Sequence, residues 1–305
     1  MMPRAAVLGH PISHSKSPAL HRAAYDFLGV ALDYAAVDVT EDALPGFLAR
    51  VRNDLRQGKS WRGLSVTMPL KSAVVRELDE VRGVARDLGV VNTVAFEPIG
   101  PVTGPLRLIG YNTDVAGIVN ALRHAGAASA PTAVVLGGGG TSAAAIAALK
   151  ILGAPRVDVF VRDVSRAAEA RAAAAAVGLP VRVLPMAGVA AAAAGADVVI
   201  STLPPRAADP LAADLAQAFA HRAGDTDAET AQARPGVLLD VAYDPWPSRI
   251  ASAWQEAGGA VVPGLEMLIY QAVEQVRHFT GLGDAMPPEV IDVMCDAVGA
   301  PRRVF

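Results

Sequence analysis

Hydrophobic positions in the first half of the chain form short apolar runs, separated by stretches in which apolar residues recur at helical spacing. Runs of about four to eight residues bounded by Gly, Pro, Asn or Asp predict strands. Ser17 and Pro18, as an N-cap and a first-turn proline, predict the start of the first helix. The predicted strands are residues 5–9, 33–39, 63–67, 91–96 and 106–111, and the helices are residues 17–28, 44–55 and a segment opened by Pro69. We therefore expect an α/β unit with some hairpin character.

The second half alternates strand and helix more regularly, which predicts a parallel sheet with helices on its faces. The predicted strands are residues 132–136, 157–161, 181–184, 197–202, 237–241 and 259–262, with helices at 141–152 and 165–177. The apolar run 183–196 is interpreted as an alanine-rich helix packed against the sheet. Residues 221–235 are polar and aperiodic, so we expect a surface insertion there and assign it no function.

Two further helices are predicted after the last strand, at residues 265–279 and 288–298. The first of them is amphipathic. No predicted strand follows these helices, so they need another apolar surface to cover. Packing against the first half of the chain is the economical solution.

Composition supports a globular protein of two domains. The chain has 305 residues, of which 52% are hydrophobic and 19% charged, which excludes a disordered chain and fits two domains of roughly 150 residues. Its 27 basic and 30 acidic residues create no strong field, so neither nucleic acid nor a membrane is an expected partner. Cys295 is the single cysteine, and the N-terminus lacks the apolar run of a secretion signal, so we expect a cytoplasmic protein. The six histidines lack metal-ligand spacing, so no metal site is predicted.

A run of four glycines lies between a predicted strand and a predicted helix, where a dinucleotide-binding loop belongs. The run fits the fingerprint in two registers, with either Ser142 or Ala143 as the small third residue. Glycine permits the tight turn and the approach of backbone to pyrophosphate, and the helix N-terminus presents free N–H groups. The residues expected at the phosphates are Gly137, Gly138, Gly139, Gly140 and Thr141.

The end of the next strand decides which dinucleotide is favoured. Arg162 and Arg166 are spaced so that both could reach the 2′-phosphate of NADP. Asp163 favours NAD instead if it bonds the ribose hydroxyls, or it serves as the N-cap of the following helix. Two arginines against one carboxylate favour NADP.

Lys71 and Asp114 are the first candidates for chemistry. Lys71 lies in the first turn of a predicted helix, where the helix dipole disfavours positive charge and eases loss of a proton. Asp114 precedes a helical apolar spacing, so it is either an N-cap or a functional carboxylate. Ser15 and Ser17 are likewise open to a capping, turn or binding interpretation.

Several motifs in this order resemble the shikimate dehydrogenase family. They are residues 9–18 (GHPISHSKSP), 65–71 (SVTMPLK), 91–93 (VNT), 112–114 (NTD), the glycine loop, 162–166, and 264–271 (GLEMLIYQ). The resemblance implies a two-domain α/β fold, with a substrate-binding and catalytic domain at 1–113 and 264–305 and a Rossmann domain for NADP at 114–263. The implied activity is reversible NADPH-dependent reduction of 3-dehydroshikimate to shikimate, on the pathway to aromatic amino acids.

The resemblance also implies roles for individual residues. Lys71 and Asp114 form the implied catalytic pair, and the two serines bind the substrate carboxylate. The implied substrate-binding set is Ser15, Ser17, Thr67, Asn92, Tyr243 and Gln271, with Asp114 also holding a hydroxyl. The implied cofactor-binding set adds Arg162, Arg166, Thr202, Leu203 and Gly264 to the glycine loop and Thr141.

Some positions depart from the family pattern. Ser65 stands where many members have asparagine, which is expected to loosen a local hydrogen bond. Val161 and Asp163 replace the asparagine and threonine that commonly flank the arginine, which weakens the NADP prediction. Glu266 takes a position often held by glycine near the nicotinamide side.

Two other functions stay open. The nearer alternative is an NAD-dependent quinate or shikimate dehydrogenase, which Asp163 supports. The other is a non-catalytic sensor that binds a nucleotide and a small acid. The presence of both Lys71 and Asp114 argues against a sensor. The sequence is compatible with a monomer or a homodimer.

Overall fold

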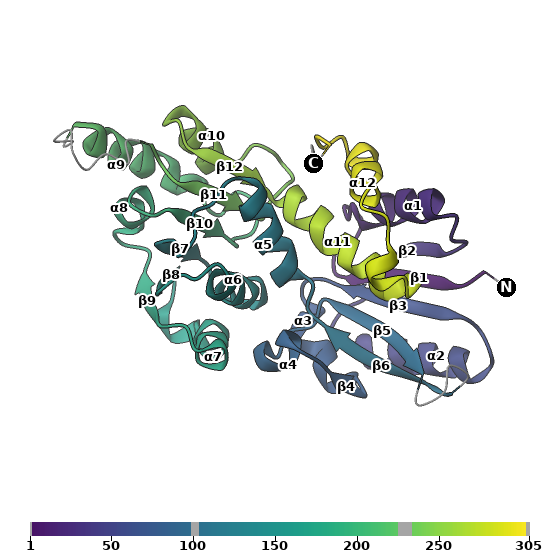
Figure 1. Ribbon diagram of the computed structural model, residues 1–305. Coiled ribbons are helices and arrows are strands. Elements are labelled where there is room, and N and C mark those ends of the chain that lie inside the picture. The colour runs from purple at the N-terminus through teal and green to yellow at the C-terminus, as the bar shows by residue number, and fades with distance from the viewer. Residues whose placement is uncertain (1, 99–103, 225–233, 303–305) are drawn as a thin grey trace. The chain divides into compact units, whose positions relative to one another are not determined.

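The computed structural model describes residues 2–98, 104–224 and 234–302, except for the side chain of Arg166. The chain divides into two compact units (Figure 1). The first comprises Met1–Asp114 and Leu268–Phe305, and the second comprises Val115–Met267. The boundaries predicted from sequence fall one and four residues earlier than these.

The first unit is built on a mixed six-stranded sheet in the order β2-β1-β3-β5-β6-β4. β1 pairs in parallel with β2 and β3, whereas β5 runs antiparallel to β3 and β6, which gives the expected hairpin character. The strands are β1 (Arg4–Gly9), β2 (Asp33–Asp38), β3 (Trp61–Val66), β4 (Glu80–Val81), β5 (Thr93–Pro98) and β6 (Leu106–Tyr111). The helices are α1 (Ser17–Leu28), α2 (Leu44–Arg56), α3 (Leu70–Ala73), α4 (Val84–Leu88), most of α11 (Gly264–Thr280) and α12 (Val290–Val298).

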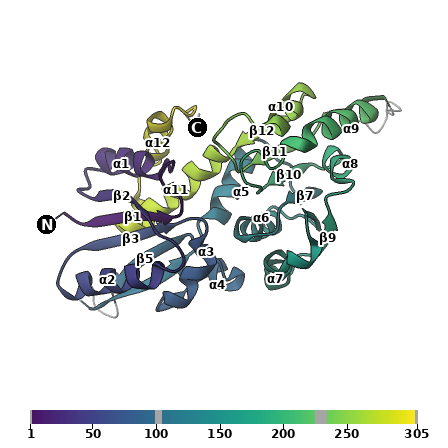
Figure 2. The same cartoon turned by 180° about the vertical axis from the view of Figure 1, so that it is seen from behind.

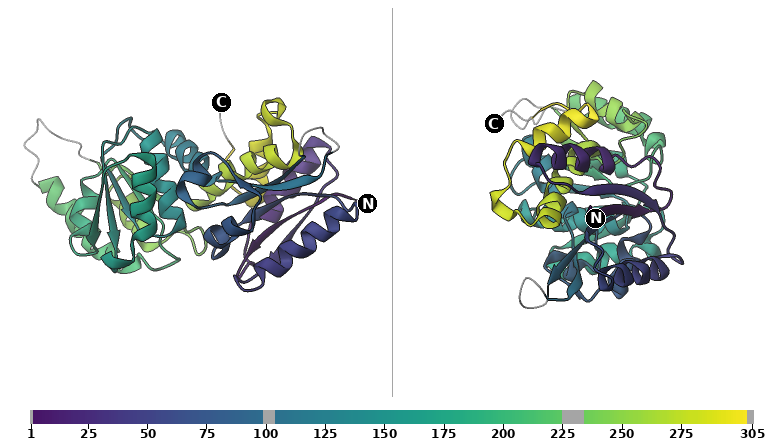
Figure 3. Two further views of the ribbon diagram at one scale, coloured as in Figure 1. Left: turned by 90° about the horizontal axis from the view of Figure 1, so that it is seen from below. Right: turned by 90° about the vertical axis from the view of Figure 1, so that its right-hand side faces the viewer.

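Alternation along β3 assigns its side chains to the two faces of this sheet. Leu64 and Val66 join the apolar cluster that includes Phe47 and Leu48 of α2. Gly63 and Ser65 point to the opposite face, where the ring of Phe279 on α11 packs directly against Gly63. On the same unit α12 lies beside α1 (Figures 1 and 3). The C-terminal helices therefore cover a face of a sheet made by the N-terminal residues.

The second unit is a parallel six-stranded sheet in the order β12-β11-β10-β7-β8-β9. This order is that of a Rossmann fold, with the switch point between β7 and β10. The strands are β7 (Ala133–Leu136), β8 (Val157–Val161), β9 (Val181–Pro185), β10 (Val198–Ser201), β11 (Val237–Asp240) and β12 (Ala260–Pro263). The helices are α5 (Asp114–His124), α6 (Gly140–Ile151), α7 (Ala168–Val177), α8 (Val189–Ala194), α9 (Ala212–Gly224) and α10 (Arg249–Glu256).

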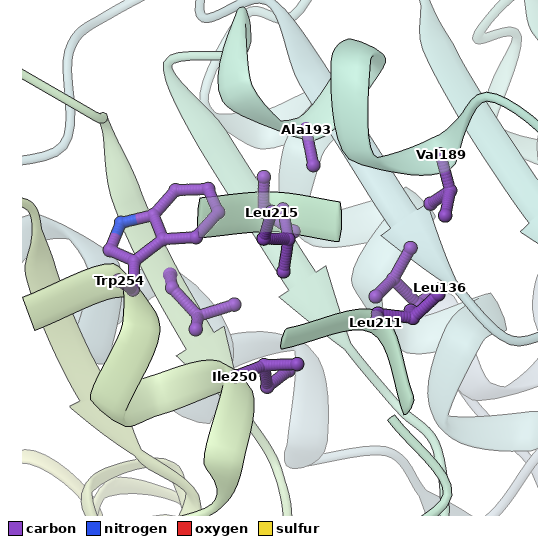
Figure 4. A pocket seen from close by; sticks show the side chains of 9 residues that line it. Leu136, Val189, Ala193, Leu211, Leu215, Ile250 and Trp254 are labelled. Atoms are coloured by element: carbon purple, nitrogen blue, oxygen red, sulfur yellow. The ribbon is translucent and has the colours of Figure 1, made fainter. Parts of the chain in front are cut away.

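Helices α8, α9 and α10 pack on one face of this sheet, and α6 and α7 lie on the other (Figures 1 and 2). Between the first three helices and the sheet lies a cavity of about 10 Å³, lined only by apolar side chains (Figure 4). Ala193, Leu215 and Trp254 are among them. A space of this size could hold about one water, but no polar partner lines it.

Three local predictions need correction, and the structure gives the length of a fourth element that the sequence left open. Ser17 is the first residue of α1 rather than its N-cap, and the capping position is held by Lys16 without a side-chain hydrogen bond. The helix after Pro69 is a single turn, α3, that continues as a 3-10 helix over Val74–Glu77. The run 183–196 is not one helix, because β9 extends to Pro185 and α8 begins at Val189. Residues 221–224 of the expected insertion belong to α9, and residues 225–233 lie outside the described residues.

Elements that sequence patterns missed are either short or alanine-rich. Strand β4 has two residues and α4 has five, too few to show a period. Helices α9 and α10 carried a usable signal, since Leu215 and Phe219, and Ile250 and Trp254, are buried pairs four positions apart. Among the described residues, no helix is both long and apolar enough to cross a membrane.

Candidate active site

Lys71 and Asp114 meet in the first unit. Nζ of Lys71 donates a hydrogen bond to Oδ2 of Asp114 at 2.5 Å, and the two side chains are only 15% and 6% exposed. Lys71 is carried by α3, directly after β3, and Asp114 begins α5, directly after β6. Two strand ends thus bring together groups 43 positions apart.

This pair can move a proton and hold a hydroxyl. A lysine ammonium has three N–H donors, and the described hydrogen bonds engage one of them, with Asp114. The other donors can serve an oxygen on which negative charge develops, which is general acid catalysis. The carboxylate fixes the ammonium and can accept a hydrogen bond from a substrate hydroxyl.

A buried amide cluster surrounds the second oxygen of Asp114. Nδ2 of Asn92 donates to Oδ1 of Asp114 at 2.8 Å and lies 3.3 Å from Oε1 of Gln271. Oδ1 of Asn92 accepts from the backbone N–H of Thr113 at 2.7 Å. Asn92, Asp114 and Gln271, all implied to contact the substrate, therefore lie together, and Thr113 is a member of the cluster that sequence reasoning missed. Its place inside the NTD motif was the available signal.

Ser65 is better bonded than its departure from the family pattern implied. Its Oγ accepts from the Tyr34 hydroxyl at 2.7 Å and donates to Oε1 of Gln275 at 2.7 Å. The expected loose hydrogen bond is therefore wrong, because Gln275 reaches the shorter side chain from α11. Gln275, one turn after Gln271 on the same helix, was another residue that sequence reasoning missed.

Of the predicted carboxylate-binding serines, Ser15 lies on the loop after β1 and Ser17 begins α1. Ser17 is buried, Ser15 is half-buried, and the backbone N–H of Ser17 donates to Oγ of Ser15 at 3.3 Å. Asp38 holds this loop by accepting from the backbone N–H of Ile12 at 3.2 Å. Thr67 is half-buried and follows β3. The described hydrogen bonds do not join either serine or Thr67 to Lys71 or Asp114.

The glycine loop in the second unit has the geometry of a phosphate cradle. Gly137 has φ +112°, and a Cβ there would lie 2.4 Å from Oγ1 of Thr202, so only glycine fits. Thr202 is held against the loop by hydrogen bonds to Leu136 O at 2.8 Å and Ser142 Oγ at 2.6 Å. Leu203 also borders Gly137.

The start of α6 completes this cradle. Gly139 is the N-cap of α6, and Gly140 and Thr141 form its first turn, where backbone N–H groups have no partner within the helix. These residues fit a pyrophosphate. Gly264, at the start of α11, is buried against the backbone of Val241.

The region expected to select the nucleotide is only partly described. Arg162 is exposed after the end of β8, and the side chain of Arg166 lies outside the described residues. Oδ1 of Asp163 accepts from the backbone N–H of Ser165 at 2.9 Å and from its hydroxyl at 2.6 Å. Of the alternatives left open for Asp163, the structure shows the cap, because this carboxylate follows the end of β8 at Val161 and caps a 3-10 helix.

Tyr243 lies on the loop after β11 and is half-buried. Asp240 anchors that loop, since its carboxylate accepts from Ser248 Oγ at 2.6 Å and from the backbone N–H of Ala242 at 3.3 Å. Burial raises the pKa of Asp240 above its ordinary value, against the opposing effect of these hydrogen bonds. Over the described ranges, no group of three metal-binding side chains occurs.

Comparison with known proteins matches both ends of the chain to one family. Residues 7–94 match the family model described as the shikimate dehydrogenase substrate binding domain, and residues 264–291 match the shikimate 5'-dehydrogenase C-terminal domain. A curated relative from Rubrobacter xylanophilus, named shikimate dehydrogenase (NADP(+)), is 36% identical over 281 residues, which cover 90% of each chain.

Solved structures agree with this match along nearly the whole chain. Shikimate dehydrogenase of Mycobacterium tuberculosis superimposes with a TM-score of 0.79 and 37% identity, over 97% of this chain and 99% of the other. Shikimate 5-dehydrogenase of Thermus thermophilus, solved in complex with NADP(H) and shikimate, gives a TM-score of 0.75 and 34% identity, over 97% of this chain and 100% of the other.

Proposed function

Because this chain belongs to the shikimate dehydrogenase family, we propose that it catalyses the reversible NADPH-dependent reduction of 3-dehydroshikimate to shikimate. The observation that carries the proposal is the partly buried pair of Lys71 and Asp114, joined at 2.5 Å. Carbonyl reduction needs a proton donor at the ketone oxygen, and this pair supplies one. The reaction belongs to aromatic amino acid biosynthesis.

The chain's own part in the reaction is acid–base chemistry and positioning. Bound NADPH supplies the hydride. Lys71 donates a proton to the ketone oxygen as negative charge develops there, and accepts it in the reverse direction. Asp114 orients the ammonium and holds the neighbouring hydroxyl.

Substrate binding is assigned to the first unit and the loop after β11. Ser15 and Ser17 bind the carboxylate. The hydroxyls are held by Thr67, Asn92, Asp114 and Gln271, and Tyr243 lines the site. The close grouping of Asn92, Asp114 and Gln271 supports this assignment.

Cofactor binding is assigned to the second unit and the start of α11. The pyrophosphate is held by Gly137, Gly138, Gly139, Gly140 and Thr141, the 2′-phosphate by Arg162 and Arg166, and the nicotinamide side by Thr202, Leu203 and Gly264. The hydrogen bonds from Ser165 give Asp163 a capping role, and the curated relative named shikimate dehydrogenase (NADP(+)) supports NADP over NAD. The protein acts in the cytoplasm, as a monomer or a homodimer.

One assay tests the function and its alternatives. Purified protein is mixed with shikimate or quinate, each with NADP or NAD, and nicotinamide reduction is followed by absorbance. We expect the highest kcat/KM for shikimate with NADP. A preference for quinate with NAD would establish the quinate alternative. Thermal stabilisation by shikimate and NADP without any reduction would identify a sensor instead.

A further inference from the structure

A buried glutamine joins the helix α11 to the strands that carry the candidate site. Gln275 is 2% exposed, and its amide makes four hydrogen bonds. Nε2 donates to Asn92 O and to Thr93 Oγ1, each at 3.1 Å. Oε1 accepts from Ser65 Oγ at 2.7 Å and lies 3.2 Å from His21 Nε2. The amide therefore uses all its main hydrogen-bonding positions.

The hydrogen bonds run from Gln275 toward Asp114 in one direction. Thr93 accepts from Gln275 and donates its own hydroxyl hydrogen to Oδ1 of Asn92 at 2.8 Å. Asn92 then donates from Nδ2 to Oδ1 of Asp114 at 2.8 Å. Each group accepts on one side and donates on the other, so neighbouring bonds polarise one another. The chain ends on the carboxylate that holds Lys71.

The same donor-to-acceptor order holds on the other side of Gln275, at His21 and Tyr25. Because an amide oxygen only accepts, Nε2 of His21 must carry a hydrogen, and Nδ1 of the neutral ring then accepts from the Tyr25 hydroxyl at 2.9 Å. Burial lowers the pKa of His21 to about 3, so the ring is neutral in this arrangement. The ring is stacked on Tyr34 with centroids 3.9 Å apart, which fixes its plane.

We propose that Gln275 is a positioning residue for the Lys71–Asp114 pair, acting through Thr93 and Asn92. Its amide fixes the orientation of the Thr93 hydroxyl, which acts together with the backbone N–H of Thr113 to hold the Asn92 amide with its N–H toward Asp114. A carboxylate that accepts this hydrogen bond is held in place for the lysine. This inference rests on the proposed dehydrogenase activity.

A purely structural glutamine would have a different signature. It would contribute to stability through its buried hydrogen bonds, and its loss would lower the fraction of folded protein. The acid limb of the kcat profile would not move, because that limb reports ionisation in the substrate complex. The positioning role predicts a moved limb, since a carboxylate that has lost its hold from Asn92 no longer places Lys71, the group that accepts the proton in shikimate oxidation.

The test compares four variants of the full chain with the wild type. Gln275→Met removes the amide at similar length, and Thr93→Val removes the linking hydroxyl while keeping the side-chain shape. Thr93→Ser restores a hydroxyl at the same position. Val276→Ala, at the neighbouring buried position of α11, creates a cavity without touching the chain of hydrogen bonds. For each variant the melting temperature, the dissociation constant for NADP, and kcat and KM for shikimate across pH are measured.

We expect Gln275→Met and Thr93→Val to lower kcat about tenfold, equivalent to about 1.4 kcal/mol of transition-state stabilisation. Both should move the acid limb while NADP still binds, and combining them should add little to either. Thr93→Ser and Val276→Ala should keep the wild-type limb. An unmoved limb in Gln275→Met, or an equal movement in Val276→Ala, would overturn the positioning role. Absence of shikimate oxidation by the wild type would instead overturn the proposed function.

Discussion

At the scale of single residues, the proposed chemistry depends on the Lys71 ammonium, which Asp114 holds in a partly buried position. Removing Lys71 as Lys71→Ala takes away the proton donor but leaves the amide cluster around Asn92 in place. We expect kcat for shikimate oxidation to fall by about 10²–10⁴-fold, with a smaller change in KM. Steady-state kinetics measures both. Lys59→Ala, which removes an ammonium paired with Asp54 on the surface, is the matched control. Turnover near that of the wild type would remove Lys71 from its role.

His21 makes the stability of the protein depend on pH. Burial lowers its pKa from 6.5 to about 3 in the folded protein, so below pH 6.5 the unfolded chain takes up a proton that the folded chain does not. The stability contributed by the neutral ring is therefore complete above pH 6.5 and is lost as the pH falls. At pH 5 the loss is about 2 kcal/mol.

Urea unfolding at pH 7.5 and 5.0 measures this contribution. In His21→Phe, which keeps an aromatic ring beside Tyr34, the difference in unfolding free energy between the two pH values should shrink by about 2 kcal/mol. The exposed His221, replaced as His221→Gln, serves as the control and should leave the difference unchanged. An undiminished pH dependence in His21→Phe would show that other groups produce it.

Residues of the candidate site were predictable from sequence where short motifs carried them. Lys71 follows its strand within one motif, and Asp114 ends another, so local pattern was enough to single them out. Gln275 was not predictable in this way. Its partners Ser65 and His21 lie 210 and 254 positions away, and only the packing of α11 on the sheet brings them together.

At the scale of elements, the turn between β7 and α6 depends on one backbone conformation. Gly137→Ala would place a methyl group 2.4 Å from Thr202 Oγ1 and hold a non-glycine residue at φ +112°. We expect a loss of about 1–3 kcal/mol in unfolding free energy and weaker NADP binding, because the loop must shift.

Gly178→Ala is the matched control for this loop. Gly178 also has a positive φ, at the C-terminus of α7, but a Cβ there meets no atom within 4 Å. This variant should lose stability while its NADP dissociation constant, measured by fluorescence titration, stays at the wild-type value. Unchanged NADP affinity in Gly137→Ala would contradict the assignment of the loop.

Helix α8 borders a space that an added side chain could fill. Ala193 faces the apolar cavity under α8, α9 and α10 (Figure 4), so Ala193→Val should raise the unfolding free energy by about 0.5–1 kcal/mol. Ala191→Val, on the exposed side of the same helix, carries the same cost in helix propensity without reaching the cavity. Chemical denaturation of the two variants measures the difference. Equal stabilities would mean that the cavity does not accept a methyl group.

Elements with a clear period were predictable, and short ones were not. Strands β7, β8, β10 and β11 follow apolar runs that both faces of a parallel sheet require. The single turn α3 and the two-residue β4 show no such period, because they are too short to establish a repeat of a helical or strand pattern. The run 183–196 contained a usable break signal, because Pro185 ends β9 and Gly188, which has a positive φ, immediately precedes α8.

At the scale of the whole molecule, the regular alternation of strand and helix predicted the parallel second unit. The covering of the first sheet by the C-terminal helices was expected only because they needed an apolar surface. Sequence showed that two helices remained after the last strand. Which face they cover depends on contacts such as Phe279 against Gly63 and α12 against α1. These contacts depend on the three-dimensional fit of side chains, which the order of hydrophobic and polar residues does not specify.

The return of α11 and α12 to the first sheet has a consequence for synthesis on the ribosome. Residues that emerge first cannot complete their unit until the last ones have left the exit tunnel, because the partners of Gly63 and α1 are made at the end. The second unit has its whole sheet synthesised by Pro263, before α11 and α12 follow. The nascent chain therefore carries an uncovered apolar face for most of translation, and chaperone demand should fall on the N-terminal residues.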